Sequence, residues 1–242
     1  MQILILSDIH GNREALQSVL DMASNQYEIG ACILLGDLID YGMHSNEVVA
    51  MIRNIKYPVI CNIWGNHEHS IVCGDYGRFS SERGRECAKY TKSVLSSQTL
   101  DYVKSEMINS GHLEFECAGR RCLAVHGSLA DEYWRSITPE QTLEEYSKYD
   151  YVFSGHSHRP HFFERYASVD DASTRNQKKT IFVNPGSAGQ PRNLNAYAQF
   201  AVLHMEQERI VFEKAEYDIG KEQSAYQGQV DDFYRARLER GI

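Results

Sequence analysis

Ser7-Asp8-Ile9-His10-Gly11-Asn12 lies between a short apolar run and a segment whose apolar residues recur at helical spacing. Residues 2–6 before it predict a buried strand, and residues 13–23 after it predict a helix. In open α/β sheets, ligands bind beyond the carboxyl ends of the strands. An aspartate and a histidine at such an end therefore indicate a functional site.

Four further predicted strands end in clusters of the same kind, each with a glycine beside residues that bind metals. The strands are 31–35, 57–63, 122–125 and 150–154, and the clusters that follow them are Gly36-Asp37, Gly65-Asn66-His67-Glu68, His126-Gly127 and Gly155-His156-Ser157-His158. Glycine lets the backbone turn sharply and approach closely, so these strand ends can converge on one pocket. Each cluster is weakly informative alone, but all of them in this order specifically indicate a shared metal site.

The residue types define the kind of metal that we expect. Imidazole, carboxylate and amide oxygen suit borderline-to-hard divalent cations, and the absence of cysteine from the clusters excludes a zinc finger. Histidines outside the clusters are expected to have core or surface roles, although two of them lie near enough in sequence to line the pocket, His69 and His161; the others are His44, His112 and His204.

The rest of the chain predicts a layered α/β fold, because short apolar runs alternate with helical segments. Helices are expected at 45–54, 82–95, 99–107, 139–148 and 221–239. Further strands are expected at 112–117, 161–166, 180–184, 197–204 and 209–217. The polar stretch 167–179 is expected to form a hairpin tip or loop. With no repeat or obvious linker, residues 1–242 are interpreted as a single domain.

Composition limits the classes of partner. The formal net charge of −8 argues against nucleic acid, and no apolar run reaches the roughly 18 residues that span a membrane. The apolar start of the chain has no basic leader and is better explained as a strand than as a signal peptide, so a cytoplasmic location is expected. The six cysteines lack zinc-ribbon spacing and are expected to be mostly buried free thiols.

Taken together, these motifs resemble the calcineurin-like metallophosphoesterase family, with its Asp-x-His, Gly-Asp, Gly-Asn-His, later His and Gly-His-x-His. The resemblance is strongest to the small bacterial branch of phosphodiesterases and diadenosine-tetraphosphatase-like proteins. Three stretches carry it: residues 7–12, Asp40-Tyr41-Gly42, and Asn184-Pro185-Gly186-Ser187-Ala188-Gly189-Gln190-Pro191-Arg192. The family fold implies a four-layer α-β-β-α sandwich of two mixed sheets flanked by helices.

The resemblance also implies roles for individual residues. One cation would be bound by Asp8, His10, Asp37 and His158, and a second by Asp37, Asn66, His126 and His156. His67 would be the catalytic histidine, oriented by Asp40, for which a turn or cap role is the alternative. The two divalent ions could be Mn, Fe, Zn, Ni, Co or Mg, because such nitrogen and oxygen ligands accept all of them.

We therefore expect hydrolysis of a phosphate ester, either a phosphodiester or a nucleotide-type substrate, by in-line attack of a hydroxide that bridges the cations. Such a bridging water has its pKa lowered from 15.7 towards about 7. Arg192 is a candidate for substrate binding, with a surface role as the alternative, and so is Asn12, with a role in shaping the turn as its alternative. A small phosphorylated substrate such as a nucleotide is the expected partner, and the oligomeric state is left open.

Several alternatives stay open at this point. A phosphomonoesterase or a dinucleoside polyphosphate hydrolase would use the same motifs, whereas a non-catalytic scaffold or a nuclease is disfavoured by the complete ligand set and the lack of a basic patch. Protein phosphatases of the superfamily carry an arginine where this chain has Tyr41, which argues against a dedicated protein phosphatase. The length of the 167–179 stretch departs from the family pattern and leaves the substrate open.

Overall fold

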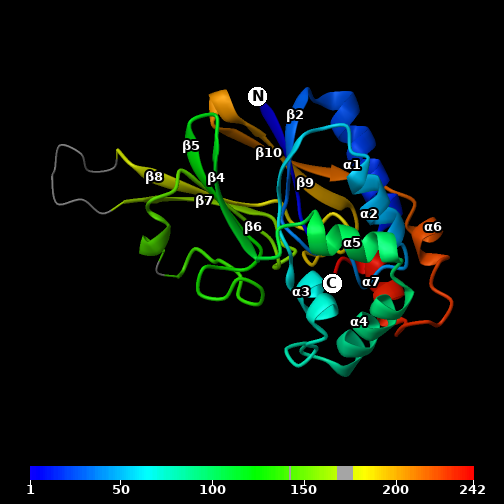
Figure 1. The fold of residues 1–242 in the computed structure, drawn as a ribbon. Helices are drawn as coiled ribbons and strands as arrows, with labels where there is room; N and C mark the ends of the chain where they lie inside the picture. Colours follow the sequence, from blue (N-terminus) through cyan, green and yellow to red (C-terminus); the bar gives the residue numbers. More distant parts are fainter. Residues whose placement is uncertain (142, 168–176) are drawn as a thin grey trace.

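Two five-stranded sheets pack face to face in the computed structural model, which describes residues 1–141, 143–167 and 177–242 (Figure 1). The first sheet has the order β10-β9-β1-β2-β3, with bounds Arg209–Ala215, Ala198–His204, Gln2–Leu6, Ile29–Leu34 and Val59–Asn62. The second has the order β4-β5-β6-β8-β7, with bounds His112–Cys117, Arg120–Val125, Tyr151–Ser154, Lys179–Asn184 and His161–Tyr166. Both sheets mix parallel and antiparallel neighbours.

Strand β1 shows why the sheets stack. Its alternate residues Ile3 and Ile5 belong to the apolar cluster between the sheets, whereas Leu4 and Leu6 belong to the cluster beneath the helices. A strand buried on both faces reads as a continuous apolar run, as residues 2–6 do. Strands β1, β2 and β3 run parallel, as do β5, β6 and β8, so the carboxyl ends within each set lie at one edge of its sheet.

Helices cover the outer face of the first sheet and continue past its strand ends (Figure 1). Their bounds are Arg13–Gln26 for α1, Ser45–Arg53 for α2, Asn66–Cys73 for α3, Glu82–Val94 for α4, Ser97–Ser105 for α5, Ile219–Gln223 for α6 and Phe233–Arg240 for α7. Two short 3-10 turns complete the described elements, η1 at Glu144–Tyr146 and η2 at Met205–Gln207. The predicted fold class, two mixed sheets flanked by helices, is confirmed.

The predicted helix at 139–148 is wrong for the described residues, which contain only η1 there. Gln141 donates its side-chain amide to the carbonyl of Ser136, and such local bonds compete with helix formation. The Thr180 hydroxyl then donates to the carbonyls of Tyr146 and Tyr149, at 3.2 and 2.8 Å. This segment is therefore bonded to the start of β8, and its apolar side chains cover the outer face of the second sheet.

The predicted helix at 221–239 is divided into α6 and α7. Gly228 has φ +87°, a left-handed conformation that interrupts a helix, and the side chain of Gln229 bonds the carbonyl of Ala225. Helix α3 was not predicted, although Gly65 and Glu68 mark its start.

Other predictions have clear outcomes. The flanks of the 167–179 stretch extend the β7–β8 hairpin, since Ala167 donates to the carbonyl of Lys178 and β8 begins at Lys179, while 168–176 lie outside the described residues. All six cysteines are free thiols, and only Cys73 among them is exposed. Within the described residues, no helix is both long and apolar enough to cross a membrane.

Candidate metal centre and active site

All seven predicted metal ligands meet where the ends of the two sheets adjoin. The loops after β1, β2 and β3 supply residues from the first sheet, and the loops after β5 and β6 supply residues from the second. The side chains that come together are Asp8, His10, Asp37, Asn66, His126, His156 and His158.

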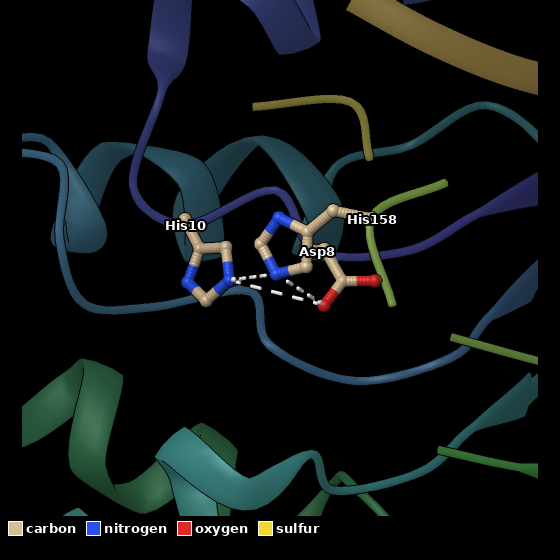
Figure 2. A group of neighbouring side chains, drawn as sticks. All are labelled: Asp8, His10 and His158. Atoms are coloured by element: carbon tan, nitrogen blue, oxygen red, sulfur yellow. Dashed lines mark hydrogen bonds and ion pairs between the residues drawn. The ribbon is translucent and has the colours of Figure 1, made fainter. Parts of the chain in front are cut away.

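The first group consists of Asp8, His10 and His158 (Figure 2). The Oδ1 atom of Asp8 lies 3.1 Å from His158 Nε2 and 3.8 Å from His10 Nε2. The two histidine Nε2 atoms lie 3.2 Å apart. Three donor atoms thus face one another in a buried space, an arrangement that a cation at their centre would stabilise.

The second group surrounds Asn66, whose Oδ1 atom lies 3.0 Å from His126 Nε2 and 3.0 Å from His156 Nδ1. Asp37 stands between the groups, because its Oδ2 atom lies 3.3 Å from His126 Nε2 and 3.6 Å from His10 Nε2. A carboxylate in that position can contribute to both groups.

The donor set fits divalent cations. Asp8 Oδ1 and Asp37 Oδ2 are buried without a hydrogen-bond partner, which is costly for carboxylate oxygens unless a cation binds them. The Nδ1 atoms of the buried histidines face backbone carbonyls: Ile39 for His10, Leu35 for His126 and Gln190 for His158. A carbonyl only accepts, so Nδ1 carries the proton and leaves the Nε2 lone pair free, as in protein metal sites.

Burial keeps most of these imidazoles neutral, the form that binds metal. It lowers the pKa of His156 to about 3 and that of His158 to about 4, and it moves the pKa of His10 well below the usual value. For His126 burial also opposes protonation, but the adjacent Asp37 carboxylate overrides it and raises the pKa to about 9. A cation at Asp37 would compete with that proton.

The backbone at this centre is held in an unusual conformation. Among the residues that the structure describes, ten non-glycine residues have positive φ, and seven of them lie here: Asp8, His10, Asp37, Asp40, Tyr41, His156 and His158. Left-handed conformations cost such residues about 1–3 kcal/mol each and cluster at functional sites. Gly65 allows the strand ends to approach, because a Cβ on it would lie 2.1 Å from Asp37 Oδ1.

His67 lies beside the two groups of proposed metal ligands, here called the metal groups. It is held by Asp40. Its Nδ1 atom is 2.6 Å from Asp40 Oδ2, and its Nε2 atom is 3.9 Å from Asp37 Oδ2. Burial alone would lower the pKa of His67, but Asp37 and the hydrogen bond to Asp40 raise it above its usual value. His67 therefore retains a proton more readily than an ordinary histidine.

A pocket of about 370 Å³ opens onto the two groups. Arg192, the candidate for substrate binding, lines it, and the Nε atom of Arg192 is buried without a hydrogen-bond partner. Tyr41 lines it as well, with its ring 4.4 Å from that of His67 and stacked at 4.6 Å on Tyr234 of α7. Sequence reasoning did not identify four further lining residues, Arg78, Phe79, Ser80 and Trp134.

Asn12 is used within the fold. Its Oδ1 atom caps α1 by accepting from the backbone N–H of Ala15, and its amide donates to the Gly189 carbonyl and the Tyr217 hydroxyl. Its side chain is thereby satisfied, which favours the alternative role of shaping the turn. His69 and His161 are not among the residues that line the pocket.

Sequence reasoning placed Glu68 in the cluster after β3 but missed its structural role: the side chain is fully buried. Its carboxylate accepts from the backbone N–H groups of Gly65, Asp37, Leu38 and Ile39. Glutamate at the third position of a helix that reaches back to the capping residue is a known start signal, and Gly65-Asn66-His67-Glu68 carries it.

A family model matches most of the chain, and this match decides the family. Residues 1–208 match the family model of the calcineurin-like phosphoesterase superfamily domain. The chain belongs to this superfamily. An uncharacterised protein of Methanocaldococcus jannaschii is 27% identical over 223 residues, which cover 90% of this chain and 89% of the relative. A symmetrical bis(5′-nucleosyl)-tetraphosphatase of Paracidovorax citrulli is 26% identical over 144 residues, 60% of this chain and 50% of that protein.

Solved structures agree with this assignment. The metallophosphoesterase of Sphaerobacter thermophilus is 25% identical with a TM-score of 0.75, and the match covers 100% of both chains. A protein of Pyrococcus horikoshii shares the fold, with 19% identity, a TM-score of 0.79, and coverage of 100% of this chain and 98% of the other. Membership of this calcineurin-like superfamily confirms the predicted class of enzyme, a phosphoester hydrolase.

Proposed function

We propose that this calcineurin-like protein hydrolyses small phosphodiester or nucleotide-type substrates with the help of two divalent cations. The observation that carries the proposal is the position of Asp37. Its unpartnered Oδ2 atom lies between His10 Nε2 and His126 Nε2, at 3.6 and 3.3 Å. Such an atom is suited to bridge two cations.

One cation would be held by Asp8, His10, Asp37 and His158, and the other by Asp37, Asn66, His126 and His156. When bound, the two cations would neutralise phosphate charge and lower the pKa of a water at the centre. Manganese is one candidate among the divalent metals that accept nitrogen and oxygen donors.

The chain's own residues orient the substrate and move the proton. The Arg192 guanidinium lines the pocket with an unpartnered Nε, so it can bind phosphate oxygens. Asp40 fixes Nδ1–H of His67 toward itself, which leaves a proton at Nε2 to protonate the leaving oxygen when the histidine is cationic. Tyr41 supplies no positive charge, which disfavours a protein phosphatase.

Dinucleoside polyphosphates are the second candidate substrates, supported by the Paracidovorax citrulli relative, a symmetrical bis(5′-nucleosyl)-tetraphosphatase. A phosphomonoester would require the same centre. The pocket opens directly onto it, and its aromatic and basic lining suits substrates with more than a bare phosphate.

The test combines metal analysis with turnover. The purified chain is expected to bind two divalent ions and to hydrolyse bis-(p-nitrophenyl) phosphate, whereas Asp37→Ala and His126→Ala lose both properties and stay folded by circular dichroism. Near wild-type turnover in either variant would contradict the proposal. A panel of Mn-loaded assays on phosphomonoesters, phosphodiesters and dinucleoside polyphosphates then ranks the substrate classes.

A further inference from the structure

One side of the pocket is formed by three residues that the metal groups do not use. Arg78, Phe79 and Trp134, here called the aromatic wall, all line the pocket. The Phe79 ring lies 5.1 Å from that of His67, and the Trp134 ring lies 6.2 Å from that of His156. The aromatic wall is thus in contact distance of both the proposed general acid and a proposed metal ligand.

Asp131 organises this wall. Its carboxylate binds Arg78 through two hydrogen bonds, of 3.3 and 2.5 Å, and accepts the backbone N–H groups of Tyr133 and Trp134. The Arg78 guanidinium lies 5.3 Å from the centre of the Trp134 ring, within the range of a cation–π contact. Phe79 meets the same ring edge-on at 5.4 Å. The indole is therefore held in place before any ligand binds.

The two arginines of the pocket differ in their available charge. Arg78 is paired with Asp131, so its charge is largely compensated. Arg192 has no such partner among the ion pairs of the described residues, and its Nε is unsatisfied. Phosphate oxygens are consequently drawn to Arg192 and to the cations that the metal groups would hold, while the aromatic wall offers a planar, polarisable surface to another part of the substrate.

We propose that the aromatic wall stacks against a nucleobase, which makes nucleotides the substrate class of this centre. The inference rests on the proposed function, since it places the base next to the phosphate-binding groups. Base stacking on aromatic and guanidinium planes tolerates any base, because every base has a π-face. The pocket of about 370 Å³ lies within the range, about 300–1,000 Å³, that holds small-molecule ligands.

The direct test is binding of AMP, with ribose 5-phosphate as the matched ligand that lacks a base. The chain has two tryptophans, and the other one, Trp64, is buried with its Nε1 bonded to the Val103 carbonyl. AMP is expected to quench tryptophan emission saturably, whereas ribose 5-phosphate and inorganic phosphate leave it unchanged. Trp134→Phe should remove the quench, which identifies the responding indole.

Equilibrium dialysis with labelled AMP measures binding without relying on tryptophan emission. Trp134→Ala and Asp131→Asn are expected to weaken AMP binding by about tenfold, as loss of a stacked base contact does, and to leave inorganic phosphate binding unchanged. Equal affinities of the wild-type chain for AMP and ribose 5-phosphate, no saturable AMP binding, or wild-type AMP affinity in Trp134→Ala would each overturn the inference.

The outcomes separate this inference from the proposed function. If hydrolysis of bis-(p-nitrophenyl) phosphate depends on metal but AMP and ribose 5-phosphate bind equally well, only the role of the aromatic wall is contradicted. Base-dependent binding without metal-dependent hydrolysis would instead contradict the proposed function and keep the wall as a nucleotide-binding surface.

Discussion

The Nδ1 atom of His67 lies 2.6 Å from Oδ2 of Asp40, and Thr91 donates its hydroxyl to the other oxygen of that carboxylate, also at 2.6 Å. All three residues are at most 2% exposed. The carboxylate is held at both oxygens, and it fixes the orientation of the histidine ring with Nδ1 toward it. The reactive Nε2 atom is consequently directed to the pocket.

Replacing His67 with alanine should slow turnover far more than it reduces metal content. A positioned general acid contributes about 10²–10⁴-fold, so kcat should fall by that range for substrates with poor leaving groups. The loss should be smaller for p-nitrophenyl esters, whose leaving group needs no proton. Steady-state kinetics across a leaving-group series, with metal content as the control, checks this, and equal losses for all leaving groups would contradict the acid role.

Asp40→Asn should shift the pH profile of kcat/KM. The pKa of His67 is raised by Asp37 and by Asp40, and a general acid loses activity as pH rises through its pKa. Without the Asp40 charge that pKa falls, so the decline on the alkaline side should begin at lower pH. Thr91→Val keeps the charge and serves as the matched control. An unchanged alkaline limb in Asp40→Asn would argue that another group controls it.

That the seven proposed metal ligands lie together could be predicted from sequence because each follows a strand, and parallel strands carry their ends to one edge. The structural role of Glu68 could not be predicted in the same way. Glu68 faces backbone N–H groups from a distant loop, and only folding brings that loop to it. The aromatic wall was missed for a related reason, since Phe79 and Trp134 come from irregular segments without periodicity.

Glu68→Ala should destabilise the protein by about 3 kcal/mol or more, because it leaves several buried N–H groups without an acceptor, at about 1–3 kcal/mol each. It should also weaken metal binding, since the same N–H groups fix the loop that carries Asp37. Urea denaturation and metal titration measure the two effects. The exposed Glu239→Ala, expected within about 0.5 kcal/mol of wild type, is the control. A similarly small effect of Glu68→Ala would contradict the assignment.

Removal of metal should lower the melting temperature. The buried carboxylates of Asp8 and Asp37 have unpartnered oxygens that a cation would satisfy. A ligand present at a hundred times its Kd stabilises by about 2.7 kcal/mol, which corresponds to about 5–10 °C for a chain of this size. Thermal unfolding with and without a chelator checks this. Asp37→Ala should show no chelator response, and a wild-type chain that shows none either would refute the prediction.

His44, which does not line the pocket, should make stability depend on pH. Its Nδ1 atom lies 3.0 Å from the buried Glu222, and this hydrogen bond raises the pKa of His44 above the usual 6.5. A group whose pKa is raised by folding contributes its full stability below its unfolded pKa and loses it as pH rises through the folded value. The free energy of unfolding of wild type should therefore exceed that of His44→Asn at pH 6 by more than at alkaline pH. A difference that does not change with pH would contradict this.

The fold was more predictable in its strands than in its helices. The strands β1, β2, β3, β5 and β6 are apolar runs closed by glycine or polar residues, and local sequence is enough to find them. The segment 139–148 has helical character locally, but the Thr180 hydroxyl of β8 donates to the carbonyl of Tyr146 within it and to that of Tyr149 just after it. That competition depends on the assembled sheet, which no local pattern reports.

The stacking of Tyr234 on Tyr41 has a consequence for how relatives are compared. The match to the family ends at residue 208, yet Tyr234 lies on α7, and Tyr226 donates its hydroxyl to the Tyr41 carbonyl at 3.2 Å. Residues after 208 therefore support the pocket-lining Tyr41, although they lie beyond the residues that match the family model. A chain that ended at residue 208 would keep every proposed metal ligand but would lose the contacts that support Tyr41. A comparison of relatives by their metal ligands alone would miss this difference.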